Sequence, residues 1–198
     1  MARIDYFLAT PSAYVYLAGK RLEEIAARHG ASIDYRPLDL GALFARTGGL
    51  SHKDRHPNRQ AYRLQEMRRQ AAKAGLPLNL HPAYFPANGA PAAYAVISAQ
   101  RAGGGDMGKL IHAIGRALWA REQNIADDDV IADCLREAGF DPALAGRGML
   151  SAAETYSANL EEAVGRGAFG VPFYIVGDER FWGQDRLDDL DAYLAGRP

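Results

Sequence analysis

Apolar and polar positions follow strand patterns near the two ends of the chain and helix patterns between them. Residues 4–9 form an apolar run, and residues 32–36 alternate polar with apolar side chains, which predicts two short strands. Between these strands, apolar side chains recur at the spacing of one helix face, at Tyr14, Leu17, Ala18, Leu22 and Ile25. We therefore expect a helix from Thr10 or Ser12 to about His29. This crossover helix favours a parallel pair of strands.

The middle of the chain predicts a block of helices. Residues 43–55 read as irregular, and a long helix begins at Pro57 and ends before Gly75. Residues 78–88, rich in aromatic residues and proline, are typical of an ordered loop. Further helices are expected at residues 90–101, 107–121, 127–138 and 151–164, the last with Ser151 and Glu154 as a capping box.

The chain returns to strands at its end. Residues 171–176 predict a strand, Gly177-Asp178 a turn, and residues 179–182 a returning strand. A final helix follows, with Asp185 as its expected N-cap. The order predicts an α/β protein with a thioredoxin-like fold (βαβ…ββα) and a large all-helical insertion. We expect residues 1–42 plus 166–198 to form the thioredoxin-like domain and residues 43–165 the insertion.

Composition narrows the class of protein. Lys and Arg total 23 and Asp and Glu 24, so a net charge of −1 gives no reason to expect a nucleic acid or an anionic membrane as partner. No apolar run approaches the roughly 18 residues of a membrane span. The start of the chain lacks the pattern of a signal peptide, and a single cysteine, Cys134, leaves no internal disulfide. These features predict a cytoplasmic protein.

Two positions carry candidate chemistry. Ser12 lies where a strand ends and a helix begins, so its hydroxyl could donate a hydrogen bond to an anion, although an N-cap alone explains a serine there. Pro172 opens the last strand pair and is a candidate for a cis peptide after Val171, the alternative being a trans proline at a strand edge.

Three segments together carry a family resemblance: residues 12–18 (SAYVYLA), 167–172 (GAFGVP) and 181–187 (FWGQDRL). With them, the chain resembles the 2-hydroxychromene-2-carboxylate isomerases over its whole length. That family is related to kappa-class glutathione transferases and lies in the DsbA-like branch of the thioredoxin superfamily. In this chain Pro11 precedes Ser12, whereas family members commonly have proline after the serine.

The resemblance implies that glutathione is the cofactor. Its thiol would lie next to Ser12, and the backbone of Val171, before Pro172, would pair with its cysteinyl part. Gln184 and Asp185 match the positions that hold the γ-glutamyl end. Arg59, three residues before Tyr62, matches a basic residue that contacts the glycyl carboxylate.

The resemblance also implies a reaction. Transient addition of the glutathione thiolate to a conjugated substrate would let a double bond rotate, a cis–trans isomerisation in aromatic compound degradation. The substrate would be a small aromatic carboxylate, with Asn88 and Tyr84 on its side of the site. A kappa-like glutathione transferase, another glutathione-dependent DsbA-like enzyme and a non-catalytic glutathione- or peptide-binding protein are the alternatives. By analogy we expect a homodimer.

The remaining polar motifs favour structural interpretations. His52 and His56 are four residues apart, but the surrounding Lys53, Asp54 and Arg55 favour a basic loop, able to hold a carboxylate, over a metal site. Cys134 lies in a helical pattern and is expected to be a small buried side chain. No metal site is predicted. Because residues 12–15 hold no cysteine, disulfide exchange through the protein's own thiols is excluded there, and a thiol nucleophile must be brought in.

Overall fold

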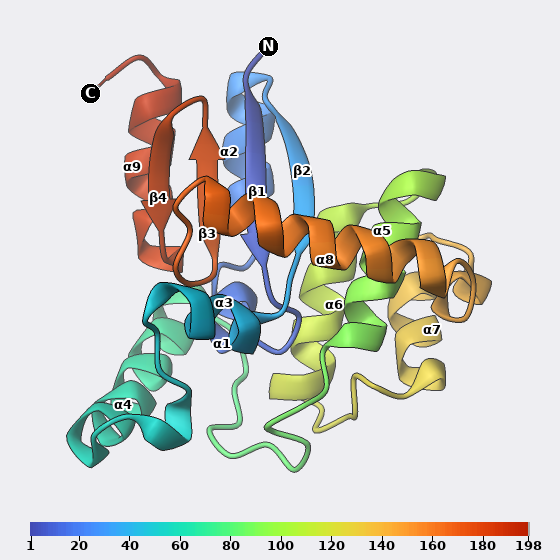
Figure 1. The fold of residues 1–198 in the computed structure, drawn as a ribbon, viewed down its shortest axis with the longest axis horizontal. Helices are drawn as coiled ribbons and strands as arrows, with labels where there is room; N and C mark the ends of the chain where they lie inside the picture. Colours follow the sequence, from blue (N-terminus) through green and yellow to red (C-terminus); the bar gives the residue numbers. More distant parts are fainter. Residues whose placement is uncertain (198) are drawn as a thin grey trace.

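A four-stranded mixed sheet forms one half of the molecule. The computed structural model describes residues 1–197, with strands β1 (Arg3–Leu8), β2 (Ser32–Pro37), β3 (Phe173–Val176) and β4 (Glu179–Trp182) in the order β2-β1-β3-β4. Strand β1 pairs parallel with β2 and antiparallel with β3, and β3 pairs antiparallel with β4. The α/β fold predicted from the element order is thereby confirmed (Figure 1).

Helices cover both faces of this sheet. On one face lie α2 (Arg21–His29) and α9 (Leu187–Leu194), joined by an ion pair of 2.7 Å between Arg28 and Asp191. Helix α8 (Met149–Gly165) crosses the other face (Figure 1). The division into residues 1–42 plus 166–198 and residues 43–165 stays a prediction.

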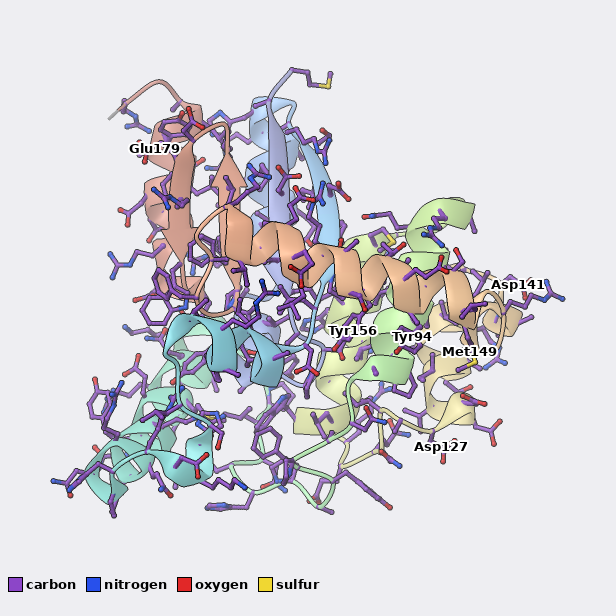
Figure 2. The ribbon with its side chains drawn as sticks, viewed as in Figure 1. Tyr94, Asp127, Asp141, Met149, Tyr156 and Glu179 are labelled. Carbon is purple, nitrogen blue, oxygen red and sulfur yellow. The ribbon has the colours of Figure 1, made fainter. Side chains whose placement is uncertain are left out.

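The remaining helices gather beside and below the sheet. Helices α5 (Ala90–Ala102), α6 (Met107–Trp119) and α7 (Asp128–Glu137) form a block, with the 3-10 turn η2 (Pro142–Ala145) after them. Tyr94 of α5 and Tyr156 of α8 meet edge to face at 5.5 Å, which joins this block to the helix across the sheet (Figure 2). Helix α4 (Pro57–Ala74) extends away from the lower end of the sheet, opposite both chain termini (Figure 1).

Two elements of the first half differ from the prediction. The first helix does not run to His29: α1 (Ala13–Leu17) ends before Gly19, whose positive φ of 62° breaks the helix, and α2 follows. Residues 43–55 are not irregular, because α3 (Leu40–Thr47) and the 3-10 turn η1 (His52–Asp54) lie there. Asp39 caps α3 by accepting the N–H of Ala42 at 3.0 Å.

Two predicted caps are also wrong. Helix α8 begins at Met149 after Gly148, with no side-chain cap, and Ser151 instead accepts a hydrogen bond from Arg101 at 2.5 Å. Asp185 does not cap the final helix, because the 3-10 turn η3 (Gln184–Arg186) intervenes before α9. Both helices begin within one turn of the predicted residue, and residue propensities alone do not fix a helix start more closely than that.

One apolar core joins the sheet to the helices. Its largest fully buried side chains are aromatic: Trp119, Tyr16, Tyr174, Phe7 and Phe173. Burial of rings of this size is the main contribution to folding, at about 25 cal/mol per Å² of apolar surface. Cys134 is buried in α7, as predicted. Within residues 1–197 no helix combines the length and the apolar character that crossing a bilayer requires.

A buried carboxylate ties β1 to β2 and α8. Asp5 of β1 is 8% exposed. It pairs with Arg166 at 2.6 Å, Arg3 at 2.9 Å and Arg36 at 3.1 Å. Burial raises the pKa of Asp5, but the hydrogen bond from Arg166 and the three positive charges outweigh it and hold the pKa below 3.8. The charged form therefore stabilises the folded state.

We predict that Asp5→Asn lowers the free energy of unfolding by about 3 kcal/mol at pH 7, because it leaves the partly buried guanidinium groups of Arg36 and Arg166 with fewer partners. Urea denaturation measures this loss, with Glu179→Gln on the exposed edge strand as the matched control. Since the folded pKa is depressed, the difference between wild type and Asp5→Asn should shrink as the pH falls below 3.8. Equal stabilities at pH 7 would contradict this role.

Candidate active site

The antiparallel pairing of β1 with β3 brings two predicted site segments together. Phe7, near the end of β1, lies opposite Phe173, the first residue of β3. The segment that leaves β1, residues 9–12, therefore lies next to the segment that enters β3, residues 170–172. Both are at the lower end of the sheet in Figure 1, beside α1 and α3.

Ser12 is held at this edge as the N-cap of α1. Its N–H donates to the carbonyl of Ala9 at 2.9 Å, and its Oγ accepts the N–H of Val15 at 3.4 Å. The capping role weighed for Ser12 is therefore present. Because Oγ is the acceptor in this long hydrogen bond, the hydroxyl proton stays available for donation to an anion.

Ser12 and Val171 line the same cavity of about 540 Å³. Its walls are largely apolar and aromatic, with Pro11, Phe44, Phe85, Pro86 and Trp182 among the lining residues. The Val171-Pro172 peptide bond is cis, so the trans alternative considered for it is wrong. The Phe85-Pro86 bond is cis as well. Pro172 is buried, and its carbonyl accepts the N–H of Gly183 at 2.9 Å.

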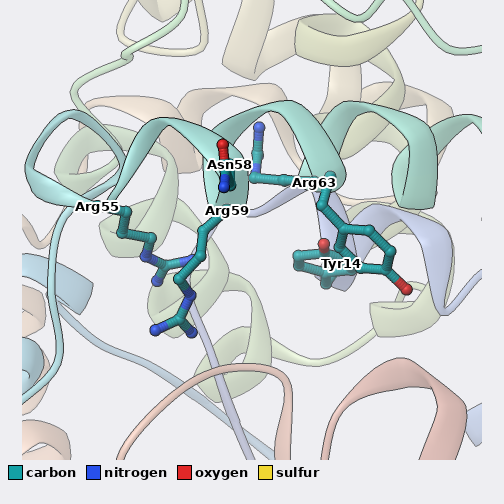
Figure 3. Close-up of a pocket in the computed structure, with 6 residues that line it drawn as sticks. Tyr14, Arg55, Asn58, Arg59 and Arg63 are labelled. Atoms are coloured by element: carbon teal, nitrogen blue, oxygen red, sulfur yellow. The ribbon is translucent and has the colours of Figure 1, made fainter.

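A second, smaller cavity of about 310 Å³ adjoins the first and is lined by basic and polar side chains: Tyr14, Arg55, Asn58, Arg59, Tyr62 and Arg63. Tyr14, Arg55 and Arg63 line both cavities. Figure 3 shows the side chains of Arg55 and Arg59 extending toward the same region below α4. The two cavities are therefore adjacent, and together they give the site an apolar part and a cationic part.

The cationic part has no carboxylate of its own. Among residues 1–197, no acidic side chain forms an ion pair with Arg55, Arg59 or Arg63. Burial lowers the pKa of both Arg55 and Arg63, and the charge of Arg59 lowers that of Arg55 further. Arginine stays protonated at neutral pH despite such shifts, so the site carries uncompensated positive charge that suits an anionic ligand.

The two histidines of the basic segment do not converge. His52 lines the larger cavity, where burial and then the charges of Arg63 and Arg55 lower its pKa to about 4. His56 instead caps α4, its Nδ1 accepting the N–H of Asn58 at 3.2 Å. In the described part of the chain, no three His, Cys, Asp or Glu side chains are grouped to hold a metal. His52 is thus a neutral hydrogen-bonding group at pH 7.

The other predicted glutathione-binding residues lie at different distances from the cavities. Arg59 lines the smaller one. Gln184 is only 5% exposed and its Oε1 has no hydrogen-bond partner, but it lines neither cavity. Asp185 is exposed and pairs with Arg186 at 3.2 Å. The structure therefore places Ser12 and Val171 in one cavity and Arg59 in the adjoining one, and leaves Gln184 and Asp185, in η3, outside both.

Both predicted substrate residues lie outside the cavity walls. Asn88 is exposed and its Oδ1 accepts the N–H of Ala90 at 3.1 Å, while Tyr84 is 48% exposed. Phe85, between them in the loop, supplies the ring that lines the cavity. Arg63, which lines both cavities, was not among the predicted residues, although it follows Arg59 by four residues in the predicted helix and therefore shares its face.

No cysteine lines either cavity. The single cysteine, Cys134, lies in α7, where burial raises the pKa of its thiol to about 11. A buried thiol with a raised pKa is a poor nucleophile. The site can therefore donate a hydrogen bond from Ser12 and attract an anion, but it holds no thiol of its own.

We predict that His52 titrates near pH 4 in the folded protein. NMR spectra recorded over a pH series follow the imidazole signals of His52, which are assigned by their absence in His52→Gln. Because the folded pKa lies below the ordinary 6.5, the unfolded chain binds the proton more readily. His52 should therefore reduce stability as the pH falls from 6.5 to 4, and His52→Gln should weaken that dependence. A midpoint near 6.5 would show that the ring is solvated.

The fold and the motifs agree with known proteins. Residues 3–195 match a family described as DSBA-like thioredoxin domain. A 2-hydroxychromene-2-carboxylate isomerase of Sphingobium xenophagum is 29% identical over 201 residues, which cover 96% of this chain and 97% of the relative.

Two solved structures extend this comparison. The structure of selenomethionine 2-hydroxychromene-2-carboxylate isomerase superposes with a TM-score of 0.80 at 25% identity, covering 98% of this chain and 95% of that one. The cytosolic disulfide reductase DsbM of Pseudomonas aeruginosa, solved with GSH, gives 0.65 at 18% identity, covering 98% of each chain. The resemblance predicted from the three sequence motifs is confirmed, and the chain belongs to the family of DSBA-like thioredoxin domains.

Proposed function

We propose that the protein is a glutathione-dependent cis–trans isomerase of the 2-hydroxychromene-2-carboxylate type, acting on a small aromatic carboxylate in aromatic compound degradation. One observation carries the proposal: the Ser12 hydroxyl, with its proton free, lines an apolar cavity that adjoins a cationic one, and no cysteine lines either cavity. The isomerase name of the Sphingobium relative supports the reaction type. A cytoplasmic location and a homodimer are part of this proposal.

The donor set of the site fits glutathione. Arg59 and Asn58 offer donors for a carboxylate in the smaller cavity, and Ser12 and Val171 lie in the adjoining larger one. The DsbM structure with GSH supports glutathione as a ligand of this fold. Bound glutathione would supply the nucleophilic thiol that neither cavity contains.

Ser12 would act as a hydrogen-bond donor to an anion. The hydroxyl favours the ionised form of a thiol, whose ordinary pKa of about 8.5 keeps it mostly protonated at pH 7. Helix α1 is only five residues long, so its dipole contributes less than that of a helix running to His29. Most of the stabilisation therefore falls to the Ser12 hydroxyl.

The apolar walls fit a flat, conjugated substrate. Phe44, Phe85 and Trp182 exclude water and offer rings for stacking, and about 540 Å³ lies in the range of small-molecule sites. His52, being neutral, offers a hydrogen bond without charge. The space leaves room for rotation about a bond of the substrate while its ends are held.

A kappa-like glutathione transferase would use the same groups for binding but release a glutathione conjugate. A merely binding protein would hold glutathione without turnover, with Ser12 acting only as a cap. Turnover measurements with two substrates separate these functions. With glutathione present, we expect isomerisation of 2-hydroxychromene-2-carboxylate and little conjugation of 1-chloro-2,4-dinitrobenzene. Conjugation without isomerisation would favour the transferase instead.

We predict that Ser12→Ala lowers kcat by about 100-fold, the usual effect of removing one donor to a charge that develops in the transition state. The assay follows isomerisation by absorbance at saturating glutathione. Ser98→Ala is the matched control, because Ser98 in α5 also donates a hydrogen bond, to the carbonyl of Arg147, away from both cavities.

Calorimetric titration with glutathione accompanies the assay. Binding by the wild type together with full turnover by Ser12→Ala would remove the proposed role of the hydroxyl. Absence of glutathione binding in the wild type would overturn the proposed function as a whole.

A further inference from the structure

Within residues 1–197, three arginines on one side of the site form no ion pair with a carboxylate, unlike most other arginines. Arg55, Arg59 and Arg63 follow at intervals of four residues, the last two on α4. Arg36 and Arg166, by contrast, face carboxylates. Two acidic side chains lie near them in the chain. Asp54 accepts a hydrogen bond from Ser51 at 2.5 Å, and Glu66 accepts hydrogen bonds from Gln70 at 2.6 Å and Arg69 at 3.0 Å. The three guanidinium groups are therefore available to a ligand.

Arg63 is the most constrained of the three. Its guanidinium carbon lies 5.7 Å from the ring centre of Phe85 and 5.9 Å from that of Trp119, and these two rings are 4.8 Å apart. Cation–π attraction to both rings orients the guanidinium plane. Its Nε is buried and has no hydrogen-bond partner. A buried donor without an acceptor is costly, and an anion bound there would remove that cost.

Arg63 and Arg55 also occupy the boundary of the two cavities, since both residues line each of them. Arg55 is held by a hydrogen bond of 3.0 Å from its Nε to the carbonyl of Leu50, with its guanidinium carbon 5.7 Å from the ring centre of Phe44. The pair thus places positive charge at the end of an apolar, aromatic-lined cavity. There, low polarity strengthens attraction to an anion.

We propose that Arg63, assisted by Arg55, binds the carboxylate of the substrate and selects planar aromatic carboxylates, whereas Arg59 serves the carboxylate of glutathione. This assignment of the substrate site rests on the proposed function. Arg59 lines only the smaller cavity and Ser12 only the larger one. Glutathione that contacts both residues would therefore leave Arg55 and Arg63, which line both cavities, to a second anion. Lys53 and His52 also line the larger cavity, but Lys53 is exposed to solvent and His52 carries no charge at neutral pH.

The test compares two probes of the same shape, trans-cinnamate and its neutral amide, cinnamamide, titrated calorimetrically into the full chain at pH 7.5 without glutathione. We expect the wild type to bind cinnamate at least tenfold more tightly than cinnamamide. Arg63→Met, which keeps an apolar stem on the two rings, should abolish this preference and leave cinnamamide binding unchanged. Arg59→Met, the matched change on the same helix, should keep the preference but weaken glutathione binding.

Further variants guard against loss of folding, which thermal unfolding of each variant monitors. Arg63→Gln should also lose the preference, and Arg63→Lys should retain part of it, because charge remains but the planar fork is lost. Equal affinities of wild type for the two probes overturn the proposal whatever the variants do. A preference that survives in folded Arg63→Met, or that disappears in Arg59→Met, overturns it as well.

The outcomes separate this inference from the proposed function. Glutathione binding without any Arg63-dependent preference for cinnamate refutes the substrate site alone. A preference that depends on Arg63, in a protein that binds no glutathione, refutes the glutathione-dependent reaction and supports the carboxylate site.

Discussion

The site depends on one pairing of strands. Phe7 of β1 lies opposite Phe173 of β3, and this register puts the residues after β1 beside the residues before β3. Ser12 and Val171, 159 residues apart in the chain, consequently line one cavity. A shift of two residues would move one segment by roughly 7 Å along the other and separate them. The ion pairs of Asp5, in the middle of β1, hold the same strand against β2 and α8.

The apolar surface and the positive charge of the site lie in adjacent cavities. The larger cavity has aromatic walls and a neutral histidine, and the smaller one has arginines without carboxylate partners. An anionic ligand with an apolar body is attracted by the arginines and loses water at the rings, so the two effects favour the same orientation. The Ser12 hydroxyl lines the larger cavity and can donate a hydrogen bond to an anion that forms there.

Local patterns were sufficient to predict much of the fold. The strands of residues 4–9 and 32–36 and the helix from Pro57 to Gly75 follow from alternation, periodicity and capping within the segment itself. The break at Gly19 was missed because the apolar periodicity of the helix continues through it. The short helix α3 was missed because its caps, Asp39 and Gly48, enclose only eight residues.

Side-chain directions at the site could not be predicted in this way. Tyr84, Phe85 and Asn88 lie in one loop, and only packing of that loop against α4 and Trp119 decides that Phe85 faces the cavity. Likewise, the position of each residue along α4 relative to that loop decides that Arg63 contacts the rings while Arg59 lines only the smaller cavity. Both side-chain placements depend on tertiary packing, and no spacing in the sequence distinguishes Arg59 from Arg63.

The ionisation of the glutathione thiol in the complex tests the central claim most directly. Thiolate absorbance in the ultraviolet, followed against pH at saturating protein and corrected for tyrosine by a blank without glutathione, gives the pKa of the bound thiol. We predict a value below the ordinary one of about 8.5 in the wild type and a return toward it in Ser12→Ala. A bound thiol with an unshifted pKa in the wild type would contradict the account.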